Sequence, residues 1–264
     1  MTYWLFYLAT GAFAGVLAGL LGVGGGLIIV PLLTFVFTAQ HLPGTYLLHL
    51  ALGTSLASIM FTSVSSFRAH HARGAVNWQV VKTISVGILT GTLLGSCVAA
   101  HLTTNFLKGF FIAFLYYVAL QMLLNIRPKP SRTLPGSGGM FGVGNVIGGV
   151  SSLVGIGGGS LSVPFLTWCN LPMHNAVGTS AAIGFPIAVA GAVGYVLNGL
   201  MATSLPDWSF GFVYLPALAG VSLASIITAP LGARLAHSLP VGKLKKIFAL
   251  LLIVMGTKML TSFL

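Results

Sequence analysis

The chain has 264 residues, of which 56% are hydrophobic and only 5% are charged. A soluble globular domain carries roughly a quarter charged residues, so this composition excludes an ordinary soluble protein and indicates an integral membrane protein. The chain has twelve Lys and Arg residues and one acidic residue, which gives a net charge of +11. The cations lie singly or in short groups between apolar segments. We therefore expect no nucleic-acid partner, a lipid bilayer around the chain and a preference for an anionic solute.

Ten apolar segments follow one another along the chain, and a helix of about 20 residues crosses a hydrocarbon core of ~30 Å. The second and seventh segments are short for a full span. The first eleven residues lack the basic region and cleavage site of a signal peptide, so we expect the first helix to belong to the mature protein. The expected segments are 3–21, 24–39, 45–66, 78–100, 106–125, 138–155, 158–170, 175–198, 210–233 and 246–263.

A hydrophilic stretch rich in proline, "NIRPKPSRTLPGSGG" at 125–139, separates two halves of the chain. We expect a first membrane repeat over 1–126, a cytoplasmic linker over 127–137 and a second, inverted membrane repeat over 138–264.

The two halves resemble each other in sequence. "LLGVGGGLIIVP" at 20–31 recurs as "LVGIGGGSLSVP" at 153–164, and "HLALGTS" at 49–55 recurs as "HNAVGTS" at 174–180. Each half holds five segments, and an odd number places the second half upside down relative to the first. The predicted fold is an all-α integral membrane protein of two inverted repeats. The first pair of segments in each half is short, broken or re-entrant at a glycine-rich elbow. Such repeats are typical of transporters that bind their solute near the membrane midplane.

The positions of the cations predict the orientation, because cytoplasmic loops carry an excess of Lys and Arg. With the linker in the cytoplasm, only Lys108 and Lys258 border the outside, together with the single acid, Asp207. Both termini then lie outside, and we expect a multi-pass protein of the bacterial inner membrane. The cations expected inside are Arg68, Arg73, Lys82, Arg127, Lys129, Arg132, Arg234, Lys243, Lys245 and Lys246.

Each elbow interrupts an apolar segment with glycines, which free backbone N–H and C=O groups. In hydrocarbon such groups cost several kcal/mol each unless protein or a wet cavity satisfies them. A helix that starts after the elbow carries a partial positive charge at its N-terminus and binds anions. We predict that two such ends converge on one oxyanion; the alternative is that the glycines serve close helix packing. The first elbow comprises Gly22, Gly24, Gly25 and Gly26, and the second elbow comprises Gly155, Gly157, Gly158 and Gly159.

The repeated "GTS" motif supplies Thr54 and Ser55 in the first half and Thr179 and Ser180 in the second. We expect these hydroxyls to line the cavity and donate to the solute. The alternative is that they bond to the backbone of their own helix.

A histidine precedes each motif at the same spacing, His49 and His174. Histidine titrates near neutrality, so these two are the candidates for proton coupling. The alternative is an interfacial or loop-capping role, since both lie near the end of a segment.

The sequence lacks the residues that enzymatic catalysis or metal binding would need. Asp207 is the only acid, so the usual carboxylate acid–base and metal sites are missing, and no G-x-x-x-x-G-K-[ST] motif is present. Cys97 and Cys169 are too few for a disulfide framework or a metal site, and we expect both thiols to be buried and inert. We therefore expect no enzyme activity, no cofactor and no metal.

The elbow stretches "AGLLGVGGGLIIVPLL" and "SSLVGIGGGSLSVPFL", each followed by "GTS", resemble the signature of the sulfite exporter TauE/SafE family of membrane permeases. The resemblance covers essentially the full chain. It implies a transporter of sulfur oxyanions or organosulfonates such as sulfite, thiosulfate or sulfoacetate. We expect a permease that works by alternating access; the alternative is a passive anion channel of the same architecture.

Overall fold

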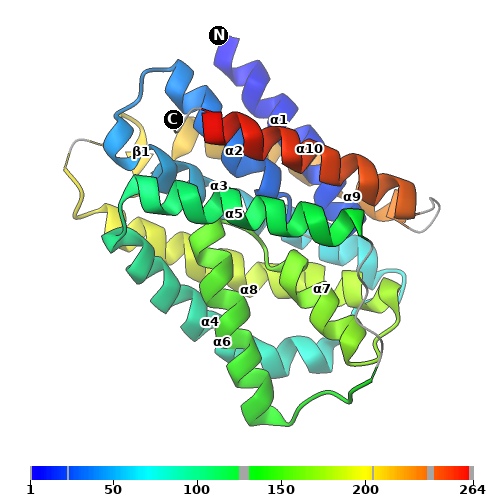
Figure 1. The fold of residues 1–264 in the computed structure, drawn as a ribbon. Helices are drawn as coiled ribbons and strands as arrows, with labels where there is room; N and C mark the ends of the chain where they lie inside the picture. The colour runs from blue at the N-terminus through cyan, green and yellow to red at the C-terminus, as the bar shows by residue number, and fades with distance from the viewer. Residues whose placement is uncertain (1, 23, 125–130, 204, 237–240, 262–264) are drawn as a thin grey trace.

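The computed structural model describes residues 2–22, 24–124, 131–203, 205–236 and 241–261, and the described residues form ten α-helices. Short elements fill two connections: a 3-10 turn, η1 (Gly44–Tyr46), and a two-stranded antiparallel ribbon, β1 (Ser209–Phe210) and β2 (Val213–Tyr214). The helices are α1 (Thr2–Leu21), α2 (Gly26–Ala39), α3 (Leu47–His71), α4 (Trp78–His101), α5 (Thr104–Leu123), α6 (Ser137–Val154), α7 (Gly159–Trp168), α8 (Met173–Gly199), α9 (Leu215–Ala236) and α10 (Val241–Thr261) (Figure 1).

Six of the helices in the described part of the chain are long and apolar enough to cross a membrane, and α2 is a shorter apolar helix. The prediction of an all-α integral membrane protein is therefore confirmed. The ten expected segments correspond to the ten helices. The helix α3 extends beyond the expected segment: it continues through a polar end to His71 and stops before Gly74, whose φ is 67°.

Rows of glycine allow two pairs of helices to pack with their backbones in contact. Gly15 of α1 lies against Ser225 of α9, and Gly91 of α4 lies against Asn145 of α6. A side chain at either glycine would collide with the neighbouring backbone, so the close packing expected of small residues in membrane helices is present. Gly11 and Gly19 of α1 lie in the same way against α9, and Gly87 and Gly95 of α4 lie in the same way against α6.

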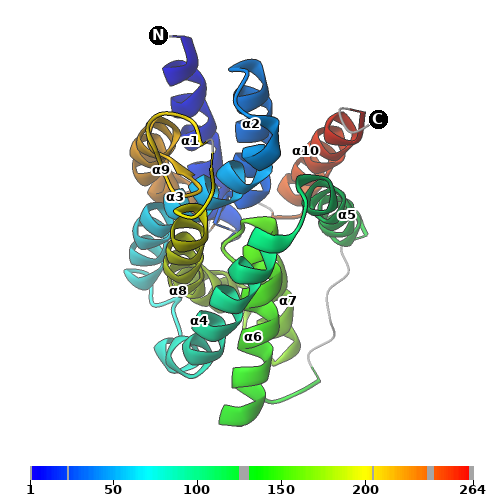
Figure 2. The ribbon, with the colours of Figure 1, turned by 90° about the vertical axis from the view of Figure 1, so that its left-hand side faces the viewer.

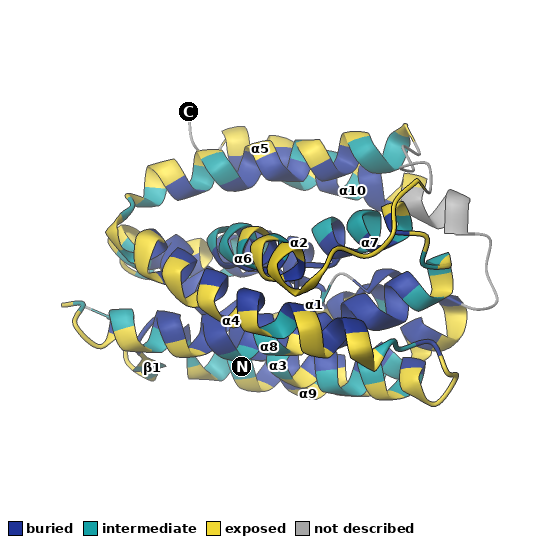
Figure 3. Cartoon of the chain, turned by 90° about the horizontal axis from the view of Figure 1, so that it is seen from below, coloured by how far each residue is buried: buried dark blue, intermediate teal, exposed yellow. Residues whose placement is uncertain are grey.

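Corresponding helices of the two halves occupy corresponding places. The helix α1 packs on α9 as α6 packs on α4, and α3 and α8 pack on each other in the centre (Figure 2). The helices α5 and α10 lie side by side and form a layer along one side of the molecule (Figure 3). Most of α3 is buried, so the residues of this helix are the ones best placed to build an internal site.

The first two helices of each half form an antiparallel hairpin. Tyr3 at the start of α1 donates a hydrogen bond to the carbonyl of Ala39 at the end of α2, over 3.2 Å. In the second half, the N–H of Ser131 bonds to the carbonyl of Trp168 at the end of α7, over 3.3 Å. Each hairpin therefore has its open ends at one side of the molecule, and its tip is the glycine elbow.

Candidate binding site at the glycine elbows

The two elbows adopt matching backbone conformations. Gly22 and Gly155 end the first helix of each hairpin with φ of 66° and 68°. Gly25 and Gly158 begin the second helix with φ of 78° and 75°. This left-handed region strains any residue with a Cβ, which explains why both halves place glycine at these positions.

The backbones of the two elbows touch. A Cβ added to Gly24 would lie 3.0 Å from the Cα of Gly157, and one added to Gly26 would collide with the carbonyl oxygen of Gly155. Any larger residue at these places would push the two hairpin tips apart. The elbows therefore bring the N-termini of α2 and α7 together inside the protein.

The N-termini of α2 and α7 receive no cap from a side chain, because Gly25 and Gly158 are the N-cap residues. The first N–H groups of an α-helix have no acceptor within the helix, and together with the helix dipole they present a partial positive charge. Each elbow therefore places the uncapped N-terminus of a helix beside the buried backbone of the other elbow.

The serine of each "GTS" motif holds the elbow of the other half. Ser55 of α3 donates to the carbonyl of Gly155 over 2.8 Å, and Ser180 of α8 donates to the carbonyl of Gly22 over 3.0 Å. Ser180 also lies 2.7 Å from the hydroxyl of Ser162 on α7. These bonds supply partners for carbonyls that the helix breaks would otherwise leave unsatisfied in an apolar surrounding.

The threonine of each motif binds a loop of the other half. Thr54 accepts a hydrogen bond from the N–H of Tyr214, and Thr179 accepts one from the N–H of Asn77, both over 2.9 Å. Both threonines and both serines of the motifs are fully buried. Among the described residues, each of the four hydroxyls has a hydrogen-bond partner in the other half of the chain, and Ser180 has a second partner in Ser162 of its own half.

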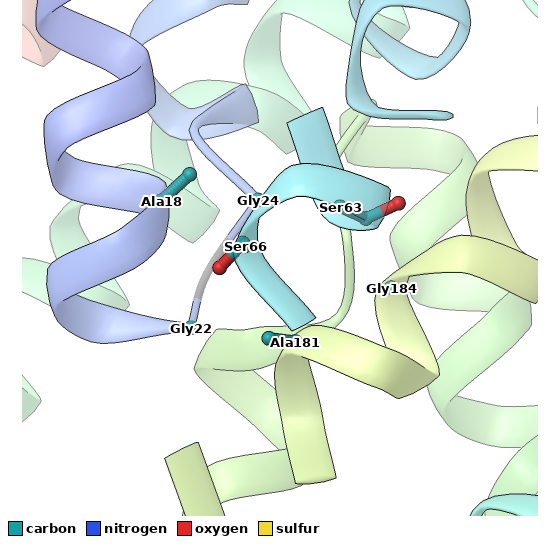
Figure 4. Close-up of a pocket in the computed structure, with 7 residues that line it drawn as sticks. All are labelled: Ala18, Gly22, Gly24, Ser63, Ser66, Ala181 and Gly184. Atoms are coloured by element: carbon teal, nitrogen blue, oxygen red, sulfur yellow. The ribbon is translucent and has the colours of Figure 1, made fainter. Parts of the chain in front are cut away.

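A small pocket lies beside the first elbow, between the end of α1, the C-terminal half of α3 and the N-terminal half of α8 (Figure 4). It has room for about one water molecule. Its walls come from two elbow glycines and from small residues of the three helices. The lining residues are Ala18, Gly22, Gly24, Ser63, Ser66, Ala181 and Gly184.

The elbow glycines divide into two roles. Gly22 and Gly24 line the pocket. A Cβ at Gly25 would instead point at α1, 2.9 Å from the carbonyl oxygen of Ala14, and a Cβ at Gly158 would meet Ile187. Gly25 and Gly158 therefore permit the turn and its packing, whereas Gly22 and Gly24 form part of the pocket wall.

The sequence analysis did not single out Ser63, Ser66, Ala181 or Gly184. A signal was present, because each of these pairs is spaced by three residues and lies on one face of a helix that carries a "GTS" motif. What the sequence does not show is which face of that helix turns toward the elbow.

The two candidate histidines differ in their surroundings. His49 is buried, its Nε2 lies 3.0 Å from the carbonyl oxygen of Ala99, and its ring packs against Tyr46 and Phe212. Its Nδ1 has no hydrogen-bond partner among the described residues. His174 is exposed. Neither histidine lines the pocket. His49 lies about 26 Å along α3 from Ser66.

The two cysteines also differ. Cys169 is buried as expected, and burial raises the pKa of its thiol while Arg132 opposes that shift. The expectation of a buried thiol was wrong for Cys97, which is exposed because it lies on the outward face of α4. Within the described ranges, no group of three or more His, Cys, Asp or Glu side chains could hold a metal ion.

Comparison with known proteins gives a consistent family. The family model described as "Sulfite exporter TauE/SafE" matches residues 7–259. A "Probable membrane transporter protein" of Haemophilus influenzae is 36% identical over 260 residues, which are 98% of each chain. "Probable membrane transporter protein YunE" of Bacillus subtilis is 29% identical over 226 residues, which are 78% of this chain and 81% of the relative.

A more distant relative, "Probable membrane transporter protein MJ0441" of Methanocaldococcus jannaschii, is 28% identical over 260 residues, covering 95% of this chain and 92% of its own. No solved structure matches this chain. The resemblance seen in the elbow and "GTS" motifs is confirmed over nearly the whole length: the chain belongs to the sulfite exporter TauE/SafE family, which places it among the membrane transporters.

Proposed function

We propose that the protein is a secondary transporter that moves a small anion, with sulfur oxyanions and organosulfonates such as sulfite, thiosulfate or sulfoacetate as the substrate class. The observation that carries this proposal is the contact between the two elbows, Gly24 against Gly157, which joins two uncapped helix N-termini inside an apolar bundle. Helix N-termini bind oxyanions through their N–H groups and dipole. The net charge of +11 supports an anionic solute.

The substrate site in this proposal comprises both elbows and the four "GTS" hydroxyls. In the present conformation those hydroxyls bond to the protein, and the pocket at the first elbow is small. The substrate therefore enters a conformation in which the hairpin tips separate and the pocket widens. The hydroxyls of Ser55 and Ser180 then exchange a carbonyl partner for the anion.

The arrangement of the halves supports alternating access. We propose that residues 1–126 and 138–264 form inverted membrane repeats joined by a cytoplasmic linker at 127–137, with both termini outside. The matched bonds Ser55–Gly155 and Ser180–Gly22, which join equivalent positions of the two halves, support this proposal.

Catalysis plays no part in this proposal, since the relatives are named as membrane transporters and Asp207 is the only acid of the chain. The energy comes from the solute gradient, the membrane potential or coupled protons. An inside-negative potential assists the exit of an anion by about 2.3 kcal/mol per charge per 100 mV, so export needs no further coupling.

The proposal is tested with purified protein in proteoliposomes loaded with labelled sulfite, thiosulfate or sulfoacetate. We expect saturable efflux of at least one of them, faster when the potential drives anions out of the vesicle. Flux that rises linearly with concentration, or single-channel currents, would identify an anion channel instead. The substrate class is wrong if none of the three is bound or moved.

A further inference from the structure

Ser66 is a buried hydroxyl without a partner in the wall of the pocket. Its side chain is 2% exposed, and its Oγ makes no hydrogen bond to any described residue. Figure 4 shows this oxygen turned toward the space between Ala18 and the first elbow. A buried hydroxyl costs free energy unless it is bonded, so a ligand or a water at this place would stabilise the wall.

Among the residues that line the pocket, Ser66 has the side-chain hydroxyl that can donate to a ligand. Ser63 already donates its proton to the carbonyl of Met60 over 3.2 Å. The other lining residues, at both elbow glycines and on α1 and α8, are glycine or alanine and carry no polar side-chain atom.

The counterparts of two pocket-wall residues in the other half pack on each other. The displacement of 125 residues that aligns the two "GTS" motifs pairs Ala181 with Leu56, and Ser66 with Gly191. The side chain of Leu56 packs on Gly191, where an added Cβ would lie 2.8 Å from Cδ1 of the leucine. The two halves therefore differ in the size of the residue at this position, Ala181 in the pocket wall and Leu56 at its counterpart, although Ser151 and Ser160 beside the second elbow also have buried hydroxyls without a partner among the described residues.

The charges around the pocket favour a ligand that accepts hydrogen bonds. Asp207, the only acid, does not line it, so a cation would find no counter-charge there. Arg68 follows Ser66 by two residues and is exposed on the opposite face of α3, outside the pocket wall, and the ring of His70 hydrogen-bonds to the carbonyl of Gly19 on α1. A small oxyanion is the ligand class that suits an unbonded hydroxyl donor in a wall without an acidic side chain.

We propose that the hydroxyl of Ser66 donates a hydrogen bond to the transported oxyanion, in a binding site formed by the first elbow with α3 and α8. This inference rests on the proposed function. It goes further by naming the side chain that binds the substrate and the elbow at which the substrate binds. The site lies in the C-terminal half of α3, toward the end of the helix that carries Arg68.

The first test compares Ser66→Ala with Ser222→Ala in proteoliposome flux of labelled sulfite, and of thiosulfate and sulfoacetate. Ser222 is the matched control, because its hydroxyl is also buried and unbonded to described residues but lies outside the pocket. We expect Ser66→Ala to raise the KM by about tenfold or more, because the variant loses one hydrogen bond to a charged group. Ser222→Ala should keep the wild-type KM. A wild-type KM in Ser66→Ala overturns the inference.

The second test fills the pocket with the residue that the other half has there, by Ala181→Leu. We expect the flux to be lost, and the ability of sulfite to raise the apparent melting temperature of the purified protein to be lost with it. Transport by Ala181→Leu at the wild-type rate shows that the substrate bypasses this pocket and refutes the site. If the wild-type protein moves none of the anions, the proposed function itself fails. If the wild-type protein moves an anion and both variants move it equally well, only the inference about this pocket fails.

Discussion

The hydroxyl of Ser55 donates to the carbonyl of Gly155, over 2.8 Å and across the boundary between the two halves of the chain. The matching bond joins Ser180 to Gly22 over 3.0 Å. Each half thus satisfies the backbone at the point where the other half breaks its helix. This reciprocity links the conformation of one elbow to the position of the other hairpin, which a transporter with two coupled halves requires.

Removing either serine hydroxyl should destabilise the protein. Ser55→Ala leaves the carbonyl of Gly155 buried without its partner, which costs about 1–3 kcal/mol. Ser180→Ala should cost at least as much, because Ser180 also bonds to Ser162. Apparent melting temperatures in detergent measure both effects. The control is Thr83→Ala, whose exposed hydroxyl bonds within its own helix, and equal melting temperatures for all three variants would contradict the reciprocal support.

A side chain at the N-cap glycines should destabilise the elbows by backbone strain and collision. Gly25→Ala places a Cβ at φ 78° and 2.9 Å from a carbonyl oxygen, and Gly158→Ala places one at φ 75° against Ile187. We expect each to cost about 1–3 kcal/mol and to lower the yield of folded protein. Gly109→Ala is the control, since nothing lies within 4 Å of its Cβ position in α5. Variants at positions 25 and 158 as stable as this control would show that the elbows are not held in the conformation described.

The proposed orientation predicts which loops a membrane-impermeant thiol reagent reaches in intact cells. In a background with Cys97 and Cys169 replaced by serine, Thr203→Cys lies in the exposed loop after α8 and should be labelled from outside. Thr133→Cys lies in the exposed part of the linker and should be labelled only after the cells are permeabilised. The reverse pattern would invert the topology and with it the side from which the pocket is reached.

Proton coupling, if histidine carries it, should depend on His49 more than on His174, because His49 is buried and His174 is exposed. We expect His49→Gln to flatten the dependence of flux on an imposed pH gradient, and His174→Gln to preserve it. The measurement is initial flux in proteoliposomes at a series of internal and external pH values. An unchanged gradient dependence in both variants assigns His49 a structural role through its contact with Ala99.

Much of the architecture could be predicted from local patterns. Hydropathy determines which segments are helices, since a membrane span must satisfy its own backbone, and the repeated glycine motif marks both helix breaks. The rows around Gly15 and Gly91 indicate close packing, and both do pack on a neighbouring helix. The partners could not be predicted, because a stripe of small residues fits any other helix that carries a matching groove.

The sequence by itself determined that this is an all-α membrane protein of the TauE/SafE family and that Gly22, Gly25, Gly155 and Gly158 would break the helices, because hydrophobicity and glycine conformation are local properties. Only the tertiary structure decided that Ser55 and Ser180 bond to opposite elbows and that Ser66 faces the pocket. The direction of a side chain depends on how its helix is rotated against distant neighbours, and that rotation is set by the packing of the whole bundle.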